Sequence, residues 1–205
     1  MVHLLYVNIF LIFVLLAFTF LGLPKFVLYF VMGMIILVVM ILIVSYFYFF
    51  VELLFTGRSF VPFVASDNKK LSKMMEIANI QKNDQVYDLG CGDGKIILEA
   101  SKYTNKKCIG YERKLDVALF GKLILWLKSA NAEIIRKDFF KENLEDADVI
   151  FVYLLPNVMK ELEPKILKEC KKGTKVISNG FEFPNWTPEN IYSIKKGKVI
   201  EYIVQ

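Results

Sequence analysis

Two long apolar runs open the chain, and a mixed pattern of apolar and polar positions follows them. The runs cover residues 4–23 and 26–51, with only Pro24 and Lys25 between them. A helix needs roughly 20 apolar residues to cross a bilayer, so each run is long enough to do so. We therefore predict three parts: a transmembrane helical hairpin in 1–57, a linker in 58–66 and one domain in 67–205.

The pattern after residue 66 alternates between short apolar strands and amphipathic helices. Ser66 or Asp67 can cap a helix whose apolar residues recur at helical spacing, namely Leu71, Met74, Met75 and Ala78. Further helices are expected at about 95–103, 114–130 and 157–170. Strands are expected in DQVYDLG, KKCIGYE, AEIIRKD, DVIFVYLLP and GTKVISNG.

One apolar stripe runs along the helix expected at 114–130, and we expect this stripe to face the core. It consists of Leu115, Leu119, Leu123 and Trp126.

The C-terminal stretch IYSIKKGKVIEYIV alternates apolar and polar residues around Lys-Lys-Gly, which indicates an antiparallel hairpin. Alternating strands and helices are typical of a parallel sheet. The fold class is therefore α/β, with a mostly parallel seven-stranded sheet and an antiparallel C-terminal hairpin.

Charge is concentrated in the second part of the chain. Residues 1–57 contain only Lys25 and Glu52 as formally charged side chains, so the net charge of +5 belongs to the rest. A cleaved signal peptide is a second interpretation of the first run, but only His3 precedes it as a basic group, and no small-residue cleavage site precedes Pro24. A mitochondrial presequence would be Arg-rich, and the first run contains no arginine. A further interpretation, a single span with the other run lying in the membrane interface, stays open.

Cysteine and histidine usage restricts the chemistry. Cys91, Cys108 and Cys170 are widely spaced and form no C-x-x-C pair, which argues against a disulfide framework and against a zinc site. His3 is the sole histidine and belongs to the apolar part. We therefore expect no metal, and a reaction that runs without imidazole.

Three glycines stand where the first predicted strand meets a helix. Gly90, Gly92 and Gly94 lie in VYDLGCGDGK, at the carboxyl end of the strand, where open α/β sheets bind ligands. Residues without Cβ let the backbone approach a ligand closely and adopt positive φ. The spacing of these glycines does not match that of a phosphate-binding P-loop or that of the G-x-G-x-x-G dinucleotide fingerprint.

The pattern present is D-x-G-x-G-x-G, from Asp88 to Gly94, with Glu112 at the end of the second strand. An acid there suits a ribose, whose two hydroxyls can both donate to one carboxylate. The alternative is a glycine turn with no ligand and an exposed Glu112.

From about Val86 to its end, the chain resembles class I, seven-strand S-adenosylmethionine-dependent methyltransferases, which implies a Rossmann-like sheet. The resemblance implies that Asp88 and the three glycines surround the methionine end of S-adenosylmethionine and that Glu112 binds its ribose. It also implies that Asp138 and Phe139 of KDFF recognise the adenine. The alternative for Asp138 and Phe139 is a turn and a core residue.

The stretches FVPFVAS and FEFPNWTPENI are similar to membrane-anchored protein-lysine methyltransferases, which include the adenine nucleotide translocase and ATP synthase c-subunit enzymes. This resemblance implies a lysine of a membrane-associated protein as the methyl acceptor. The mitochondrial address is not carried over, because this chain has two apolar runs. YLLP, residues 153–156, departs from the acid-or-Asn and Pro-Pro pattern of many amino-group methyltransferases, which argues against DNA-adenine and glutamine targets.

Candidate residues around the transferred methyl are aromatic, and aromatic faces suit a cationic head group. They are Tyr153, a candidate catalytic residue, and the substrate-pocket candidates Phe60, Phe63, Phe183 and Trp186. Alternatively, Phe183 and Trp186 cover the end of the sheet in place of a helix. Removal of the amine proton falls to Tyr153, a carboxylate or solvent, and the sequence does not choose among them.

Lysines gather at 69–73, 171–172 and 195–198. They form either a solvated face or a contact with an anionic lipid surface. Nucleic acid is an unlikely partner, since arginines interleaved with aromatics are missing from these stretches.

Two spans return a chain to the side on which it starts, and S-adenosylmethionine is a cytoplasmic metabolite. We therefore expect a multi-pass membrane protein whose catalytic domain faces the cytoplasm, and Arg58 after the second run agrees. Two other functions stay open: methylation of a membrane-soluble small molecule such as a quinone or lipid, and a non-catalytic module that binds S-adenosylmethionine.

Overall fold

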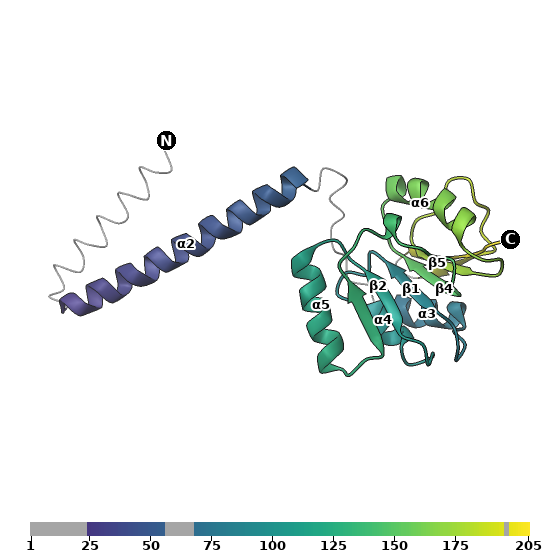
Figure 1. Cartoon of the computed structure of the whole chain (residues 1–205), viewed down its shortest axis with the longest axis horizontal. Helices are drawn as coiled ribbons and strands as arrows, with labels where there is room; N and C mark the ends of the chain where they lie inside the picture. The colour runs from purple at the N-terminus through teal and green to yellow at the C-terminus, as the bar shows by residue number, and fades with distance from the viewer. Residues whose placement is uncertain (1–23, 56–67, 195–196) are drawn as a thin grey trace. The chain divides into compact units, whose positions relative to one another are not determined.

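The computed structural model describes residues 24–55, 68–194 and 197–205 (Figure 1). The chain divides into two compact units, Met1–Phe60 and Val61–Gln205, and each is described by itself. Several expectations lie outside the described residues: the first apolar run, the linker, the caps Ser66 and Asp67, and the aromatic residues Phe60 and Phe63.

The first unit contains a single described helix, α2 (Lys25–Phe55), which is 31 residues long. Its stretch Lys25–Tyr48 is long and apolar enough to cross a membrane, judged by length and composition. Large apolar side chains of this stretch are exposed along its length. This helix corresponds to the second apolar run of the sequence.

The second unit is built on a seven-stranded sheet with the strand order β3-β2-β1-β4-β5-β7-β6. The strands are β1 (Val86–Leu89), β2 (Cys108–Tyr111), β3 (Ala132–Ile135), β4 (Val149–Val152), β5 (Lys175–Asn179), β6 (Asn190–Ile194) and β7 (Gly197–Ile203). The first five are parallel, while β7 pairs antiparallel with both β5 and β6. The predicted mixed sheet with an antiparallel C-terminal pair is therefore confirmed.

Helices cover the two faces of this sheet unequally. Three of them, α3 (Asn68–Ala78), α4 (Lys95–Ala100) and α5 (Leu115–Leu127), lie on one face, where Met74, Ile97 and Leu125 join a buried cluster. The other face is covered by α6 (Pro156–Glu169), through Met159, Leu162 and Ile166 (Figure 1). A short 3-10 turn, η1 (Phe139–Lys141), follows β3.

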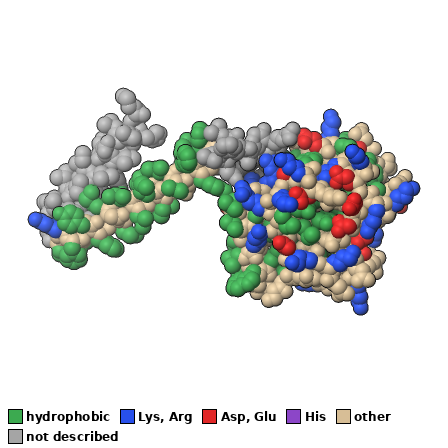
Figure 2. Space-filling model, viewed as in Figure 1, with side chains coloured by type: hydrophobic (Ala, Val, Ile, Leu, Met, Phe, Trp, Pro, Cys, Tyr) green, Lys and Arg blue, Asp and Glu red, His purple; other side chains and the backbone are tan. Residues whose placement is uncertain are grey.

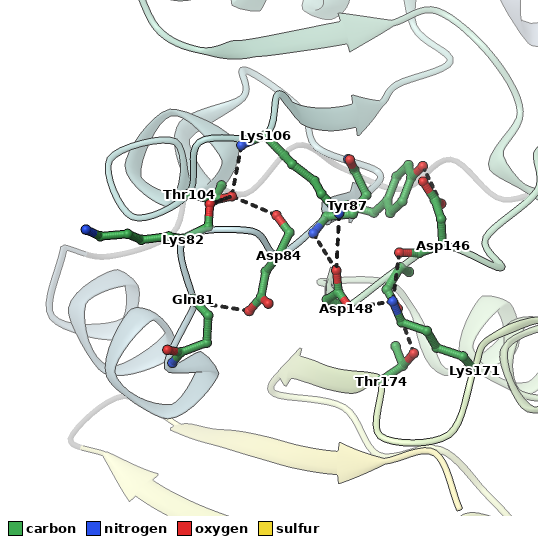
Figure 3. A network of polar contacts seen from close by, with 12 residues as sticks. Gln81, Lys82, Asp84, Tyr87, Thr104, Lys106, Asp146, Asp148, Lys171 and Thr174 are labelled. Carbon is green, nitrogen blue, oxygen red and sulfur yellow. Dashed lines mark hydrogen bonds and ion pairs between the residues drawn. The ribbon is translucent and has the colours of Figure 1, made fainter.

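A polar network ties together the amino ends of the parallel strands (Figure 3). Asp148 is its centre: one carboxylate oxygen accepts from the Gln85 N–H over 2.7 Å, and the other pairs with Lys171 Nζ at 2.5 Å. Nearby, the Tyr87 hydroxyl donates to Asp146 over 2.9 Å. Burial alone would raise the pKa of Asp148, but the hydrogen bonds from Lys171 and Gln85 and the nearby positive charges outweigh it, so its pKa is lowered. The glycine loop lies at the opposite edge of the sheet, where the parallel strands have their carboxyl ends.

The prediction for the apolar stripe of α5 is wrong. Leu115, Leu119, Leu123 and Trp126 are 36%, 57%, 50% and 75% exposed. The side against the sheet consists instead of Ala118, Gly121 and Leu125. Small residues are needed on that side because a Cβ on Gly121 would lie 2.9 Å from the backbone carbonyl carbon and oxygen of Asp93.

Candidate functional site

The glycine loop, residues 90–94, joins β1 to α4 and bends sharply at each of its glycines. Gly90, Gly92 and Gly94 have φ values of +82°, +56° and +77°, the left-handed region that side chains with a Cβ rarely adopt. The N–H groups of Gly90 and Cys91 donate to the carbonyl of Tyr111 over 2.9 and 3.0 Å. The loop is therefore fixed to the carboxyl end of β2. The turn lies between the first strand and a helix, where the sequence predicted it, and ligand binding by the loop stays a prediction.

Asp88 lies directly below this loop and has an unsatisfied carboxylate oxygen. It is 2% exposed, and it pairs across the sheet with Gly110 of β2 and Phe151 of β4. Its Oδ2 is buried and makes no hydrogen bond. Burial, reinforced by the negative charges of Glu112 and Asp93, raises the pKa of Asp88 well above its usual value. A buried polar atom without a partner costs stability unless something satisfies it, so this position suits a ligand that donates a hydrogen bond or carries positive charge.

Glu112 connects the end of β2 to the middle of the loop. Its Oε2 accepts from the Gly92 N–H over 3.1 Å, while Oε1 accepts from the N–H groups of Arg113 and Lys114 over 2.8 and 2.9 Å. The structure thus brings Glu112 to the glycine loop, next to the buried Asp88. An unused lone pair on this partly exposed carboxylate can accept from a ligand hydroxyl.

Two further glycines make room around the loop, and sequence reasoning missed both. A Cβ on Gly110 would lie 2.5 Å from Cys91 Sγ, and Gly121 meets Asp93 as described above. The signal that could have found them is a lone glycine inside a strand or a helix, which often marks a close backbone approach. Asp93 was missed as well; its Oδ1 accepts from the Lys95 N–H over 3.2 Å.

Asp138 and Phe139 lie at the carboxyl end of β3, at the same edge of the sheet. Asp138 Oδ1 accepts from the Phe140 N–H over 3.2 Å and caps the turn η1. Phe139 is 6% exposed, and its ring centroid lies 4.6 Å from that of Phe140. Both contacts agree with the turn-and-core alternative, and a role in adenine recognition stays a prediction.

Tyr153 follows β4 at the same edge and packs against a residue that the sequence did not single out. Its ring is stacked on Phe181, with centroids 6.4 Å apart and an interplanar angle of 24°. Phe181 follows β5 and comes directly after Gly180, whose φ of +93° turns the chain. The two rings therefore lie after the carboxyl ends of β4 and β5, and β4 is the strand next to β1.

Phe183 and Trp186 pack elsewhere, on Tyr202 of β7. Their ring centroids each lie 5.0 Å from that of Tyr202, and the Phe183 N–H donates to the Tyr202 hydroxyl over 3.0 Å. The Asn185 N–H donates to Glu163 of α6 over 3.0 Å. These contacts place both rings on the face of the sheet that α6 also covers, rather than at the end of the sheet in place of a helix. Contact with substrate stays a prediction.

The amino-acid sequence and this fold both match known methyltransferases. The ANTKMT methyltransferase domain matches residues 88–190. A protein-lysine N-methyltransferase of Saccharolobus islandicus is 38% identical over 68% of this chain and 88% of its own length. The adenine nucleotide translocase lysine N-methyltransferase of Mus musculus is 30% identical over 70% of this chain, although the match spans only 63% of the mouse enzyme.

A solved structure extends the match to the fold. An RNA methyltransferase from Salinibacter ruber in complex with S-adenosyl-L-homocysteine has a TM-score of 0.66 and 26% identity, over 69% of this chain and 94% of its own. S-adenosyl-L-homocysteine is what remains of S-adenosylmethionine after methyl transfer. The chain therefore belongs to the ANTKMT methyltransferase domain family and is an S-adenosylmethionine-dependent methyltransferase.

Proposed function

We propose that this enzyme methylates a lysine amino group of a membrane-associated protein, and that the residues around the glycine loop hold S-adenosylmethionine. The observation that carries the cofactor site is the buried, unpartnered carboxylate oxygen of Asp88 beneath the loop. Both relatives are named as lysine N-methyltransferases, which supports lysine as the acceptor.

The charges and shape of the loop fit this cofactor. S-adenosylmethionine has an ammonium and a sulfonium group against one carboxylate, so it is cationic. Asp88, Asp93 and Glu112 supply three carboxylates, and the pKa of Asp88 is raised by its burial and, to a smaller extent, by repulsion from Glu112 and Asp93. Positive charge at this place relieves that repulsion. Gly90, Gly92 and Gly94 leave the backbone open for close approach.

Within this arrangement, each predicted residue has a distinct task. We assign Asp88 to the methionine ammonium and Glu112 to the ribose hydroxyls. Asp138 and Phe139, at the end of β3, serve the adenine. The bound cofactor supplies an electrophilic methyl on sulfur, and the protein supplies alignment and exclusion of water.

The acceptor amine has to be uncharged before it can react. Tyr153 and Phe181 offer aromatic faces on which a lysine head group can rest. Partial desolvation between such rings lowers the pKa of a lysine amine, so proton loss becomes easier. We place Tyr153 closest to the amine, as the group that orients it and accepts a hydrogen bond from it.

Helix α2 supports a membrane location for this reaction. The stretch Lys25–Tyr48 is exposed and apolar enough to span a bilayer. With the first apolar run as a second span, the domain and the N-terminus face the cytoplasm. Substrate lysines then lie near the membrane surface, on other membrane proteins.

Methylation of native membranes tests the proposal. Membranes containing the full chain are incubated with S-adenosylmethionine labelled in its methyl group, then separated into protein and lipid extract. We expect label in protein, on lysine side chains identified by mass spectrometry, and none with the Gly92→Val variant. Label in the lipid extract would overturn lysine as the acceptor, and no label in either fraction would indicate a binding module.

A further inference from the structure

The side of α5 that faces away from the sheet is the most apolar exposed surface among the described residues of the second unit. Six large side chains project from it: Leu115, Leu119, Phe120, Leu123, Trp126 and Leu127. We call this surface the α5 face. At about 100° per residue, these positions occupy one arc of roughly 140°, opposite the buried Ala118, Gly121 and Leu125. Figure 2 shows hydrophobic side chains gathered over this edge of the unit.

Helix α6, on the other face of the sheet, shows the usual pattern of a helix that faces water in this same unit. Of its large apolar side chains, only Leu167 is among the exposed ones. Its other exposed positions include Lys160, Glu161 and Lys168. A tryptophan that is 75% exposed, with five apolar neighbours, departs from this pattern, and such patches mark contact sites.

We propose that the α5 face lies in the interfacial layer of the membrane that α2 enters. The combination of residues fits a lipid surface: Trp126, Phe120 and four leucines form the apolar side, with Asp116 as the acidic residue within their arc. The exposed Lys122 lies at the margin of the arc, and the exposed Lys128 follows the last residue of the helix. Helices that lie in a bilayer interface carry Trp, Phe and Leu on one side and basic residues on the other. Lysines at that depth are attracted to anionic head groups.

Chain length keeps the α5 face within reach of the bilayer. Helix α2 ends at Phe55 and α3 begins at Asn68, so twelve residues lie between them. Fully extended, such a segment spans at most about 45 Å. This step rests on the proposed membrane span of α2, whereas the composition of the α5 face does not.

This placement decides where the active edge opens. Helix α5 starts at Leu115, shortly after β2 ends at Tyr111, so its N-terminus lies at the carboxyl edge of the sheet. A helix that follows a parallel strand runs back along it. With α5 flat on the membrane, the strands lie along the bilayer plane, and the edge that carries Glu112 and Tyr153 opens sideways at head-group level. A lysine of another membrane protein, at the level of the head groups, can then enter the site from the side.

Depth measurements with spin labels test the α5 face directly. The full chain is reconstituted into vesicles of equal parts phosphatidylcholine and phosphatidylglycerol, with a nitroxide on Leu119→Cys. A matched label on Lys160→Cys reports the solvent side of α6, and one on Val38→Cys reports α2. Cys91, Cys108 and Cys170 are buried, so the chain without added cysteines gives the labelling background. Collisions with oxygen, which dissolves in lipid, are compared with collisions with a water-soluble nickel chelate.

We expect the ratio of oxygen to nickel collisions to be several-fold higher at position 119 than at position 160. The double variant Lys122→Glu, Lys128→Glu should lower the ratio at 119 in anionic vesicles and leave that at 160 unchanged. Equal ratios at 119 and 160 overturn the proposal. Protection of position 119 from both reagents also overturns it, because protein would then cover the face. Loss of the high ratio at less than one chain per vesicle overturns it as well, because a second copy of the chain would then be what covers the face. The reading at 38 decides separately whether α2 spans the bilayer.

Discussion

Glu112 Oε2 accepts a hydrogen bond from the N–H of Gly92 over 3.1 Å, so the end of β2 holds the middle of the glycine loop. One carboxylate therefore has two tasks, shaping the loop and offering an acceptor to a ligand. The two can be separated, because a glutamine keeps the length and one oxygen of the side chain but loses its charge.

We expect Glu112→Ala to weaken S-adenosylmethionine binding by about 1.5–3 kcal/mol, because a charge-assisted bond to the ribose is lost together with the bond from Gly92. Glu112→Gln should weaken it less. Titration calorimetry measures both, and circular dichroism checks that the fold is retained. Unchanged affinity in the alanine variant would remove Glu112 from the site.

Asp88→Asn should separate stability from cofactor binding. The pKa of Asp88 is raised in the folded chain, so the native state holds a proton that the unfolded state releases. The wild-type chain without cofactor should therefore lose stability as pH rises above about 4, and the asparagine variant should lack this loss. Denaturant unfolding at several pH values measures the difference. Cofactor affinity should nevertheless fall in the variant, since the negative charge is gone; an unaffected affinity would contradict the assignment to the ammonium.

Gly121→Ala should harm cofactor binding from a position on the inner side of α5, which contacts the backbone of the glycine loop rather than the ligand. The added Cβ would lie 2.9 Å from the backbone of Asp93, so the glycine loop or the helix has to move. We expect a loss of about 1–3 kcal/mol in unfolding free energy and weaker cofactor binding. Lys122→Ala, at the next and exposed position, is the control and should change neither. Normal binding by Gly121→Ala would show that the loop tolerates the shift.

Tyr153→Phe should lower the rate of methyl transfer without changing cofactor affinity. The substitution removes the hydroxyl and keeps the ring that stacks on Phe181. Loss of the hydrogen bond that orients the attacking amine should lower the rate by roughly 100-fold. Single-turnover transfer of labelled methyl to membranes measures it, with Phe181→Leu as a test of the ring contact alone. A wild-type rate in Tyr153→Phe would leave a carboxylate or solvent to take the proton.

At the other edge of the sheet, Asp148→Asn should destabilise the fold by about 1–2 kcal/mol near neutral pH. The pKa of Asp148 is lowered in the folded chain, so its contribution is present above the usual value of 3.8 and is lost as pH falls through the folded pKa. The wild-type and variant unfolding energies should therefore converge in acid. Lys107→Ala, which breaks the exposed pair with Glu133, should cost less than about 0.5 kcal/mol.

The sequence predicted the strands, their mixed sheet and the glycine loop because each has a local signature. Alternation and apolar runs mark the strands, and three closely spaced glycines mark the turn. Helix α4 was expected to reach Tyr103 and ends at Ala100, where the Ser101 hydroxyl donates to the Leu98 carbonyl and the chain turns. The chain continues to Tyr103 as tighter turns, in which the Lys102 and Tyr103 N–H groups donate to the carbonyls of Glu99 and Ala100, and periodicity does not distinguish such turns from the helix.

Tertiary contacts explain the remaining differences. The apolar stripe of α5 was assigned to the core, yet the inner side consists of Ala118, Gly121 and Leu125, and the glycine loop lies so close to Gly121 that no side chain fits there. Phe181 was missed because Gly180 turns the chain after β5, and this turn directs Phe181 rather than Phe183 toward Tyr153. In both cases, a glycine whose role is visible only in three dimensions decides which neighbour faces inward.

Helix α5 is the single layer that separates the glycine loop from the α5 face, and this arrangement has a thermodynamic consequence. Its inner side touches the backbone of Asp93 in the glycine loop, and its outer side is the α5 face, roughly 10 Å away across one helix diameter. Thermodynamic linkage is reciprocal. If a contact on the α5 face changes the affinity for the cofactor by some factor, bound cofactor changes the affinity of that contact by the same factor. Membrane binding through the α5 face, measured with and without S-adenosylmethionine, therefore reports any coupling between the two sides of this helix.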